Sequence, residues 1–373
     1  MFGDISNDQT AIDTAPGILT IDLRALAANY RQLKQRVGAA RVAGVVKADA
    51  YGLGAARVVP ALYAAGCRDF FVAQFGEAQA IIRTLGRDAR LYVLNGLQPG
   101  TERACAEAGI IPVLNSLDQL ANWSRCARAR GTELPALLQF DTGMSRLGLP
   151  PDDVDILLQQ PSRLEGVRLL HVMSHLASAD EPNSPQNAEQ LAVMRRFAAA
   201  FPGIEPCFAN SGGIFLGSDY HGALVRPGIA LYGGAPTAGV ANPMRPVVRL
   251  DVRVVQTRLV PAGARVGYGG VHVTPGERRL ATISAGYADG LPRALSDRGA
   301  AYHGDVRLPI VGRVSMDSLT VDATALPPGT LTLGTLVEII GPHQTLEDVA
   351  RDAGTIPYEI LTALGRRYHR IFH

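Results

Sequence analysis

The chain has 373 residues, of which 47% are hydrophobic and 19% charged, and its formal net charge is +2. This length exceeds what a single growing core usually supports, so two domains are expected. The near-neutral charge gives no reason to expect nucleic acid or an anionic membrane surface as a partner, and no stretch is apolar for long enough to span a membrane.

The cysteines and the N-terminal segment indicate the compartment. Cys67, Cys105, Cys126 and Cys207 are scattered, and no two of them form a C-x-x-C pair. This argues against a metal site and against a disulfide framework, and it is typical of a reducing cytoplasm. Residues 1–16 lack the basic and apolar segments of a secretory signal. We expect this extension to be loosely ordered or packed on the C-terminal domain.

From Asp22 onward the sequence predicts an amphipathic helix, because apolar residues recur every three or four positions. This apolar stripe consists of Leu23, Leu26, Tyr30, Leu33 and Val37. Short apolar runs then alternate with helical stretches, which predicts an α/β fold with eight parallel strands, a TIM-like (β/α)8 barrel. A doubly wound open sheet is the competing architecture, but no G-x-G-x-x-G motif follows the first strand. The expected strands are 42–46, 70–73, 91–94, 110–114, 136–140, 166–172, 204–208 and 228–232, and the clearest helices are 79–85, 117–130 and 188–200.

The composition of the sequence changes near residues 233–242, where small residues predict a linker. Leu250, Val252 and Val254 then alternate with charged residues, as in a half-exposed strand. We therefore expect three segments: the extension 1–16, the barrel 17–240 and a mostly β C-terminal domain 241–373. Further strands are expected at 280–284, 306–311, 319–322 and 336–340, followed by helices at 346–352 and 358–364.

Lysine is nearly absent from this chain. Lys34 and Lys47 are the only lysines among 36 basic residues, so a function that arginine cannot perform is worth considering. Arginine keeps its proton, whereas a desolvated lysine can lose its proton and react with an aldehyde. Lys47 ends the first apolar run, where a reactive amine could serve covalent chemistry. Position alone favours the alternative, a lysine that extends its charged head into solvent.

In such a barrel the chemistry belongs at the carboxyl ends of the strands. Unusual clusters fall there: 141–148 after the fifth run, Ser174 and His175 after the sixth, and 210–213 after the seventh. Each cluster alone is compatible with an ordinary turn or a buried polar group. Together, a serine with neighbouring glycine amides could hold a phosphate. A phosphate-bearing aldehyde bound to a lysine is pyridoxal phosphate.

At this point the chain resembles the alanine racemase family. Six motifs carry the resemblance in the family's order, over about residues 17 to 372. These motifs are Val-Val-Lys-Ala-Asp-Ala-Tyr-Gly at 45–52, Asp-Thr-Gly-Met at 141–144, Val-Arg-Pro-Gly-Ile-Ala-Leu-Tyr-Gly at 225–233, Gly-Tyr-Ala-Asp-Gly at 286–290, Gly-Arg-Val-Ser-Met-Asp at 312–317 and Thr-Ile-Pro-Tyr-Glu at 355–359. The resemblance implies a pyridoxal phosphate-dependent isomerase, active as a cytoplasmic homodimer with shared sites. It would interconvert L- and D-alanine and supply D-alanine for peptidoglycan.

The resemblance also implies a role for each matched residue. Lys47 would bind the cofactor covalently and act as a base on one face, and Tyr268 of the partner subunit would act on the other. Because tyrosine titrates near 10, Tyr268 would need nearby cations or a desolvated network, and His175 could relay the effect of Arg226. Arg226 would face the cofactor's ring nitrogen and, as a pure donor, leave it unprotonated. The full set of implied cofactor contacts is Lys47, Tyr51, Arg146, His175, Asn210, Ser211, Arg226, Gly228, Ile229 and Tyr358, and the implied substrate contacts are Arg146, Met316, Asp317 and Tyr287.

The sequence departs from the family pattern at four positions. Leu53 replaces a histidine, Ser145 replaces the glycine before the site arginine, and Ser315 replaces a frequent cysteine. Gln139 replaces a lysine that is often carbamylated and orients the site arginine. We therefore predict that Arg146 is held by a neutral hydrogen bond and that no carbamate forms.

There are four alternatives to an alanine racemase, and the residues argue against two of them, the barrel decarboxylase and the non-catalytic barrel. A racemase of broader specificity, acting on serine or on other small or basic amino acids, would use the same residues. A barrel decarboxylase would place an acid, not Arg226, against the ring nitrogen. A non-catalytic pyridoxal phosphate-binding barrel would lack the β domain with Tyr268. An aldolase using a lysine without the cofactor would lack the cofactor's absorption.

Overall fold

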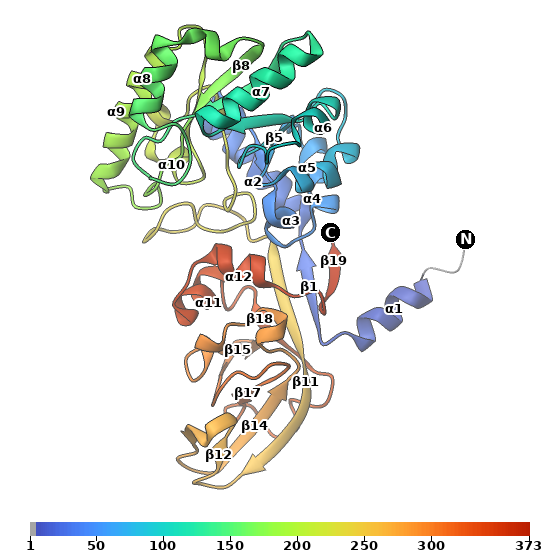
Figure 1. The fold of residues 1–373 in the computed structure, drawn as a ribbon. Coiled ribbons are helices and arrows are strands. Elements are labelled where there is room, and N and C mark those ends of the chain that lie inside the picture. Colours follow the sequence, from blue (N-terminus) through green and yellow to red (C-terminus); the bar gives the residue numbers. More distant parts are fainter. Residues whose placement is uncertain (1–4) are drawn as a thin grey trace. The chain divides into compact units, whose positions relative to one another are not determined.

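The computed structural model describes residues 5–373, which divide into two units. One unit is Leu26–Arg245, and the other joins Pro246–His373 to the described residues up to Ala25. Figure 1 shows both units as ribbons, coloured along the chain. Residues 1–4, where the loosely ordered extension was expected to begin, lie outside the described residues.

The unit Leu26–Arg245 is built on a nine-stranded sheet whose strand pairings are all parallel. The strand order is β2-β10-β9-β8-β7-β6-β5-β4-β3. The two end strands, β2 and β3, are separated only by Ala43, so the sheet closes on itself. This confirms the predicted barrel. The strands are β2 (Arg41–Val42), β3 (Gly44–Val45), β4 (Asp69–Val72), β5 (Arg90–Val93), β6 (Ile111–Leu114), β7 (Leu134–Gln139), β8 (Val167–Met173), β9 (Pro206–Cys207) and β10 (Leu224–Val225).

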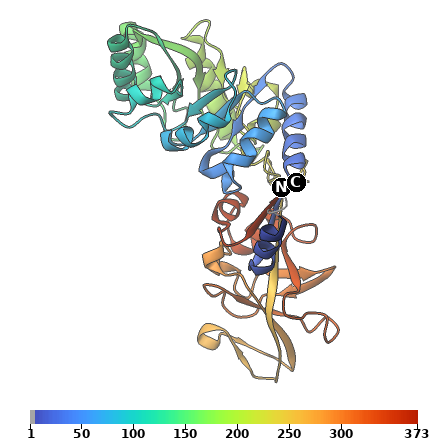
Figure 2. The same cartoon turned by 90° about the vertical axis from the view of Figure 1, so that its right-hand side faces the viewer.

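The barrel strands are buried on both faces, because side chains fill the interior and helices cover the outside. Every residue of β4 and of β6 is buried. The helices lie outside the ring of strands (Figures 1 and 2). Local signals set their ends: Ser116 caps α7 by accepting a hydrogen bond from the amide of Gln119 at 3.2 Å, and Gly131 ends it with φ of 63°. The helices are α2 (Leu23–Val37), α3 (Lys47–Tyr51), α4 (Ala55–Ala64), α5 (Phe75–Ile81), α6 (Glu102–Glu107), α7 (Leu117–Arg130), α8 (Pro151–Gln159), α9 (Pro185–Ala199) and α10 (Gly213–Leu216).

The eighth strand does not lie where the sequence predicted it. The apolar run 228–232 is buried, but it forms consecutive turns, in which the amide of Leu231 donates to the carbonyl of Gly228 at 2.9 Å. The strand is instead β10, four residues earlier, which pairs with β2 and β9. The apolar run is buried because it packs inside the barrel unit, and burial alone does not distinguish a strand from a turn.

The second unit is built mainly on an eight-stranded sheet that is mostly antiparallel. The long strand β11 lies at its centre and pairs with β1, β14 and β18. The alternating pattern around Leu250 predicted this strand, and alternate residues over the first half of β11 are buried. The strands are β1 (Gly17–Ile21), β11 (Val248–Val260), β12 (Arg265–Val266), β13 (His272–Val273), β14 (Arg278–Ile283), β15 (Ala300–His303), β16 (Val306–Pro309), β17 (Leu319–Asp322), β18 (Leu336–Ile340) and β19 (His369–Phe372), and the helices are α1 (Ile5–Thr14), α11 (Leu346–Ala353) and α12 (Pro357–Ala363).

The N-terminal boundary of the barrel differs from the expected residue 17. Strand β1 belongs to the C-terminal sheet, antiparallel to β11 and parallel to β19. A side chain at Gly17 would come within 2.7 Å of the carbonyl oxygen of Asp251, so the close pairing requires glycine there. Arg253 of β11 also donates to the carbonyls of Ile12 and Ala15, which ties the end of α1 to this unit. These pairings join positions more than 200 residues apart, which no local pattern indicates.

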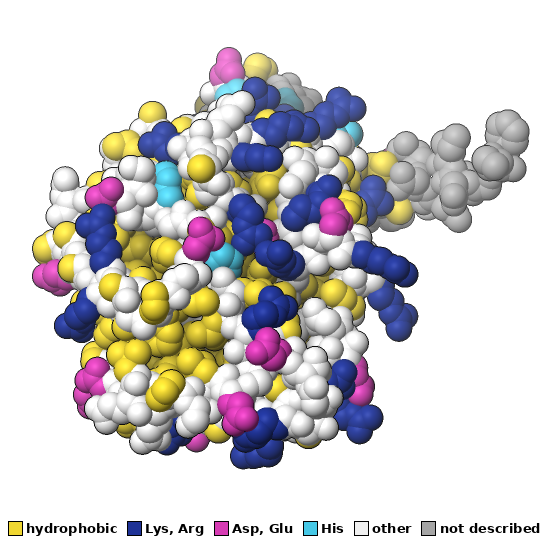
Figure 3. Space-filling model, turned by 90° about the horizontal axis from the view of Figure 1, so that it is seen from above, with side chains coloured by type: hydrophobic (Ala, Val, Ile, Leu, Met, Phe, Trp, Pro, Cys, Tyr) yellow, Lys and Arg dark blue, Asp and Glu magenta, His cyan; other side chains and the backbone are white. Residues whose placement is uncertain are grey.

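On the face shown in Figure 3, charged side chains surround an area where hydrophobic side chains gather.

In the part of the chain that the structure describes, no helix combines the length and apolarity needed to cross a membrane.

Candidate active site

Lys47 lies directly after β3, at the carboxyl end of a barrel strand, where (β/α)8 enzymes carry their chemistry. Its side chain is half-buried, and no hydrogen bond from its amine to another described residue is present. Burial and then the positive charge of Arg146 lower the pKa of this amine, against an opposing contribution from Glu77. A larger neutral fraction is what covalent bonding to an aldehyde requires.

The turn that follows Lys47 has an unusual backbone. Residues 48 to 51 are not glycines, yet their φ angles are 53°, 53°, 55° and 57°. This left-handed conformation costs a residue with a side chain roughly 1–2 kcal/mol. The amide of Ala50 donates to the carbonyl of Val46 at 2.9 Å, and that of Gly52 to the carbonyl of Ala48 at 2.7 Å. Such strain persists where the surroundings fix the conformation, and it is concentrated at functional sites.

The left-handed turn places Tyr51 against two other parts of the barrel. Its ring stacks on Tyr232, with centroids 4.6 Å apart, and the Tyr232 hydroxyl donates to the carbonyl of Val45 at 2.9 Å. A Cβ on Gly228 would lie 2.0 Å from the Tyr51 hydroxyl. The hydroxyl therefore occupies the space that any other residue at position 228 would need.

Ser211 completes this cluster. Its hydroxyl oxygen accepts from the amide of Gly228 at 2.9 Å and from that of Ala230 at 3.3 Å. The barrel thus brings together four predicted phosphate contacts, namely Tyr51, Ser211, Gly228 and Ile229. Hydroxyls and backbone amides are the neutral donors that a phosphate group needs, so these residues fit the predicted cofactor, with the Gly228 amide bonded to Ser211 in this structure.

Arg226 is buried and anchored by its guanidinium. One terminal nitrogen donates to the carbonyl of Cys207 at 2.8 Å and to its sulfur at 3.2 Å, and the other donates to the carbonyl of Ser174 at 2.7 Å. These bonds fix the side chain across β8, β9 and β10. A guanidinium held in this way is a permanent cation and a pure donor at the barrel's carboxyl end.

His175 lies between two donors. Its Nδ1 is 3.4 Å from Arg226, and its Nε2 is 3.5 Å from the amide nitrogen of Asn210. The Asn210 amide is oriented by a bond to the carbonyl of Leu176 and by one from the amide of Gly213. A neutral ring accepts at one nitrogen only, and we assign Nδ1 as the acceptor because Arg226 is a permanent donor. Nε2 then carries the hydrogen, and its contact with the Asn210 amide nitrogen is not a hydrogen bond. Burial and then the charge of Arg226 hold the pKa of His175 well below its usual range.

The Arg146 loop differs from the prediction. The Asp141 carboxylate organises this loop by accepting from three amides, those of residues 143, 144 and 145, at 2.9–3.1 Å. Ser145, at the family's glycine position, has φ of 55°, which explains why glycine suits that position. Arg146 itself is exposed, while Gln139 is buried in β7. Among the described residues, no hydrogen bond joins the two, so the predicted neutral bond is wrong for this structure.

Tyr268 belongs to the C-terminal unit, at the tip of the hairpin formed by β12 and β13. Its side chain is 71% exposed, more than that of Tyr287 or Tyr358. Gly267 and Gly269 on either side have φ of 70° and 74°, so the glycines flanking this tyrosine are needed for the turn. Within its own unit, this tyrosine is presented outward.

The predicted substrate contacts of the C-terminal unit form a second cluster. The amide of Tyr287 donates to the carbonyl of Ser315 at 3.0 Å, and the carboxylate of Asp317 accepts from Arg367 at 2.7 Å. Arg367 also makes a bidentate pair with the buried carboxylate of Asp289, at 2.6 and 2.7 Å. Tyr287 and Met316 are both about half exposed, at 46% and 53%. A backbone hydrogen bond thus joins the segment of Tyr287 to that of Ser315, and the side chains of Tyr287 and Met316 on these segments are partly exposed.

The predicted site residues therefore fall into two groups. The barrel holds nine of them: Lys47, Tyr51, Arg146, His175, Asn210, Ser211, Arg226, Gly228 and Ile229. The C-terminal unit holds the other five: Tyr268, Tyr287, Met316, Asp317 and Tyr358. Tyr358 lies in the first turn of α12 and is 41% exposed, so this predicted phosphate contact belongs to a different unit from the other four.

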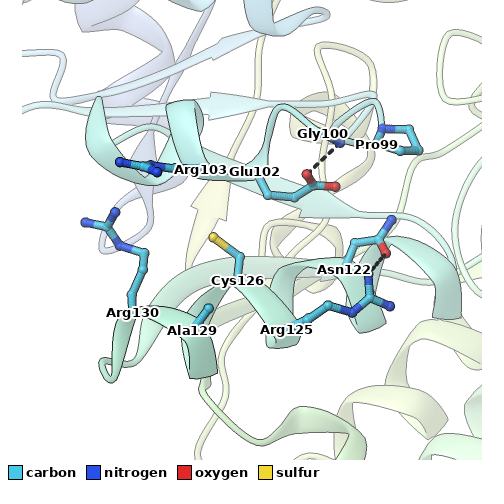
Figure 4. A pocket seen from close by; sticks show the side chains of 9 residues that line it. All are labelled: Pro99, Gly100, Glu102, Arg103, Asn122, Arg125, Cys126, Ala129 and Arg130. Atoms are coloured by element: carbon cyan, nitrogen blue, oxygen red, sulfur yellow. Dashed lines mark hydrogen bonds between the residues drawn. The ribbon is translucent and has the colours of Figure 1, made fainter.

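A separate hollow lies on the outside of the barrel, between α6 and α7 (Figure 4). Its volume is about 660 Å³, and none of the predicted site residues lines it. Arg103 and Arg130 at its edge both pair with Glu107, at 2.8 and 3.7 Å. These two arginines therefore have an acidic partner within the barrel itself.

Three residues of the barrel site were missed by sequence reasoning. Tyr232 supports the Tyr51 ring, Cys207 anchors Arg226, and Glu77 bonds to the amide that follows Lys47. Tyr232 and Cys207 lie in predicted strands, where the sequence indicates only that their side chains belong to the hydrophobic core. Glu77 stands three residues after Gln74, a spacing typical of a helix start, and that signal could have drawn attention to it.

The fold and the two residue groups define a class: a (β/α)8 barrel with a lysine at a strand end and a phosphate-fitting cluster, followed by a β domain. Comparisons with known proteins agree with this class. The family profile "Alanine racemase, N-terminal domain" matches residues 21–236, and "Alanine racemase, C-terminal domain" matches residues 247–372. The chain belongs to the alanine racemase family.

Individual relatives are close over their whole length. A protein of Rhizobium johnstonii named "Alanine racemase, catabolic" is 64% identical over 361 residues, covering 97% of this chain and 96% of that protein. The "Alanine racemase" of Brucella canis is 58% identical over 371 residues, covering 96% and 94%. The crystal structure of the Bartonella henselae alanine racemase with covalently bound pyridoxal phosphate matches with a TM-score of 0.93 and 47% identity, covering 96% of this chain and all of that one.

Proposed function

We propose that this protein is a pyridoxal phosphate-dependent racemase that interconverts L-alanine and D-alanine. The observation that carries the proposal is the barrel group: a lysine with a lowered pKa, a phosphate-fitting cluster and a buried arginine at the same end of the barrel. Membership of the alanine racemase family and the cofactor in the Bartonella henselae structure support it.

The barrel geometry supports the following cofactor contacts. Lys47 would bind the cofactor covalently, and Tyr51, Ser211 and the amides of Gly228 and Ile229 would hold its phosphate. When bound, pyridoxal phosphate withdraws electrons from the substrate's α-carbon and makes the α-proton acidic. Arg226 would face the ring nitrogen as a donor that cannot give up its proton, which limits how much charge the ring accepts. A ring that accepts little negative charge still allows the α-proton to exchange, but it disfavours side reactions such as transamination.

Racemisation needs an α-proton removed from one face and returned to the other. We propose that Lys47 serves one face and Tyr268 of a second copy of the chain serves the other. The exposure of Tyr268 at a hairpin tip supports a role between copies. His175, held neutral with its Nε2 hydrogen available, would link that tyrosine to Arg226 and help it to ionise.

The substrate carboxylate would be bound by residues of both units. Arg146 would supply the charge from the barrel, and Met316 of the second copy would donate its backbone amide. Among residues 5–373, that amide donates no hydrogen bond, which supports this role. Tyr287 and Asp317 would close the same pocket. The homodimer with shared sites is therefore part of the proposal, as is the domain division near residues 245 and 246.

Two physiological roles fit this reaction. We propose supply of D-alanine for peptidoglycan, in the cytoplasm, and the free thiols of all four cysteines support a reducing compartment. The relatives from Rhizobium johnstonii and Agrobacterium fabrum are named catabolic, which favours alanine breakdown as the second candidate. Deletion of the gene separates them, since loss of supply requires added D-alanine for growth, whereas loss of breakdown abolishes growth on alanine as the carbon source.

The activity is tested by incubating the purified protein with L-alanine, L-serine and L-arginine while following D-isomer formation and the cofactor's visible absorption. We expect rapid conversion of alanine and a band near 420 nm, typical of a lysine-bound cofactor. Faster conversion of serine or arginine would replace the proposal with a broader racemase. Absence of the band would exclude the cofactor.

The two-base assignment has its own test in deuterated water. With Tyr268→Phe, Lys47 can still exchange the α-proton of the isomer whose proton faces it, without inversion. We expect solvent deuterium to enter one alanine isomer and not the other. Equal loss of exchange from both isomers would contradict the assignment.

A further inference from the structure

Glu77 contacts the turn that carries Lys47. Glu77 lies in the first turn of α5, on the neighbouring βα segment of the barrel. One carboxylate oxygen accepts from the amide of Ala48 at 2.5 Å. The other accepts from the amides of Ala73 and Gln74, at 2.8 and 2.9 Å. A single side chain therefore joins the start of α5 to the residue directly after Lys47.

The contact to Ala48 exceeds what a helix cap requires. The bonds to Ala73 and Gln74 already satisfy the amides at the start of α5. Ala48 is the first of the four left-handed residues, and its amide donates to Glu77. Tyr51 is the last of the four, so the same turn determines where both Lys47 and the Tyr51 hydroxyl lie.

Only a carboxylate can make these three bonds. Both Glu77 oxygens act as acceptors, on opposite sides of the group. A glutamine of the same shape has one acceptor oxygen and one amide donor. Its amide would face either the N–H group of Ala48 or those of Ala73 and Gln74. The orientation that keeps two of the three bonds places the amide against Ala48, so the bond to the turn is the one that is lost.

We propose that Glu77 is a positioning residue for cofactor binding: its carboxylate holds the left-handed turn and so places Lys47 and Tyr51 for the covalent and phosphate contacts of pyridoxal phosphate. The inference rests on the proposed function. It assigns Glu77 no contact with the cofactor or the substrate. The carboxylate acts through the backbone of residues 48 to 51.

The test compares Glu77→Gln with a matched control, Glu102→Gln. Glu102 also begins a barrel helix, α6, and its carboxylate also accepts a backbone hydrogen bond, from Gly100 at 2.8 Å. Glutamine at position 102 keeps an acceptor oxygen for the single bond from Gly100, so that variant removes a charge at a helix start without losing a bond, whereas Glu77→Gln releases the turn after Lys47. Titration of the dialysed full-length proteins with pyridoxal phosphate gives the affinity, and hydrogen exchange of residues 46–54 reports the local order.

We expect Glu77→Gln to weaken pyridoxal phosphate binding by about tenfold or more, the loss typical of one charge-assisted hydrogen bond. Exchange should rise in residues 46–54 and not across the rest of the barrel. Glu102→Gln should bind the cofactor within about twofold of the unsubstituted protein. If both variants bind equally, or if exchange rises uniformly, Glu77 is only a helix cap and the inference is overturned.

A second variant keeps the test decisive should Glu77→Gln not fold. Glycine adopts the left-handed conformation without the side-chain penalty, so Ala48→Gly added to Glu77→Gln should recover folding and part of the cofactor affinity. Failure of the double variant to improve on the single one would overturn the inference. If the unsubstituted protein itself does not bind pyridoxal phosphate at Lys47, the proposed function fails instead, and the two failures are distinguishable.

Discussion

Substitution of Gly228 by alanine tests the geometry of the phosphate-fitting cluster. The added Cβ would lie 2.0 Å from the Tyr51 hydroxyl and 2.9 Å from the ring carbon that bears it. Carbon and oxygen atoms rarely approach within ~3.0 Å, so the hydroxyl has to move by about 1 Å or more. Stacking on Tyr232 and the left-handed backbone of Tyr51 oppose that movement.

The size of the effect follows from overpacking. We expect Gly228→Ala to lower the free energy of unfolding by about 1–3 kcal/mol. The displaced hydroxyl also leaves the position from which it would hold the phosphate. The affinity for pyridoxal phosphate should therefore fall about tenfold, the value of one hydrogen bond to a charged group. Urea unfolding and a titration of the cofactor's absorption measure the two quantities.

Two further variants make the result specific. Gly76→Ala is the matched control, because its Cβ would meet no atom within 4 Å and it lies at the start of α5, where alanine is favoured. It should leave cofactor affinity unchanged. Adding Tyr51→Phe to Gly228→Ala removes the closest atom and should restore part of the stability, but not the affinity. A Gly228→Ala protein with unchanged stability and affinity would refute the geometry.

Other consequences concern the remaining site residues. Mixing Lys47→Ala chains with Tyr268→Phe chains should restore about a quarter of the sites under random assortment, and no recovery after verified subunit exchange contradicts shared sites. The folded chain keeps His175 neutral, because its pKa lies well below 6.5. In the unfolded chain the same ring takes up a proton below about pH 6.5. The free energy of unfolding therefore keeps the full contribution of His175 above about pH 6.5 and decreases at lower pH, by up to about 1.4 kcal/mol per pH unit. His175→Asn should remove that part of the slope in urea unfolding at pH 5 and 7.5, and an unchanged slope contradicts a neutral ring. Arg226→Lys should lose one of two buried carbonyl bonds and about 1–3 kcal/mol of stability, measured by the same unfolding, and full stability would show that the guanidinium is not needed. Native mass spectrometry should find no carboxylated residue in a chain with Gln139, and an added mass of one carbon dioxide would contradict this.

Elements with a strong local pattern were predicted well. The helix 117–130 and the strands 319–322 and 336–340 have the bounds of α7, β17 and β18. Each carries an apolar period or an apolar run with clear ends, such as Ser116 and Gly131 around α7. The barrel class also followed from local information, because the alternation of strands and helices permits few architectures.

Features that depend on distant pairing were not predicted. Strand β1 has five residues, and its membership of the C-terminal sheet is decided by β11 and β19, more than 200 residues away. Strand β10 has two residues, which is too short for a periodic signal, so the longer apolar run 228–232 was preferred. The role of Glu77 depends on a left-handed backbone at residues 48 to 51. None of these residues is glycine, so their conformational preferences predict a different backbone.

The site was predictable to the extent that family motifs name its residues. Those motifs identify Lys47, Tyr51 and Arg226 but not the contacts that hold them. The bonds of Arg226 to Cys207 and Ser174 come from three strands that the barrel brings together. The prediction for Arg146 failed because a loop capped by Asp141, and not the strand residue Gln139, determines where that arginine lies.

Covalent labelling of the two lysines tests the central claim most directly. The protein is loaded with pyridoxal phosphate, treated with borohydride, digested and examined by mass spectrometry. Lys34 serves as an internal control, because it is exposed on α2 and is the only other lysine in the chain. We predict that the peptide containing Lys47 carries the reduced cofactor and that Lys34 does not. An unmodified Lys47, or equal labelling of both lysines, would contradict the proposed site.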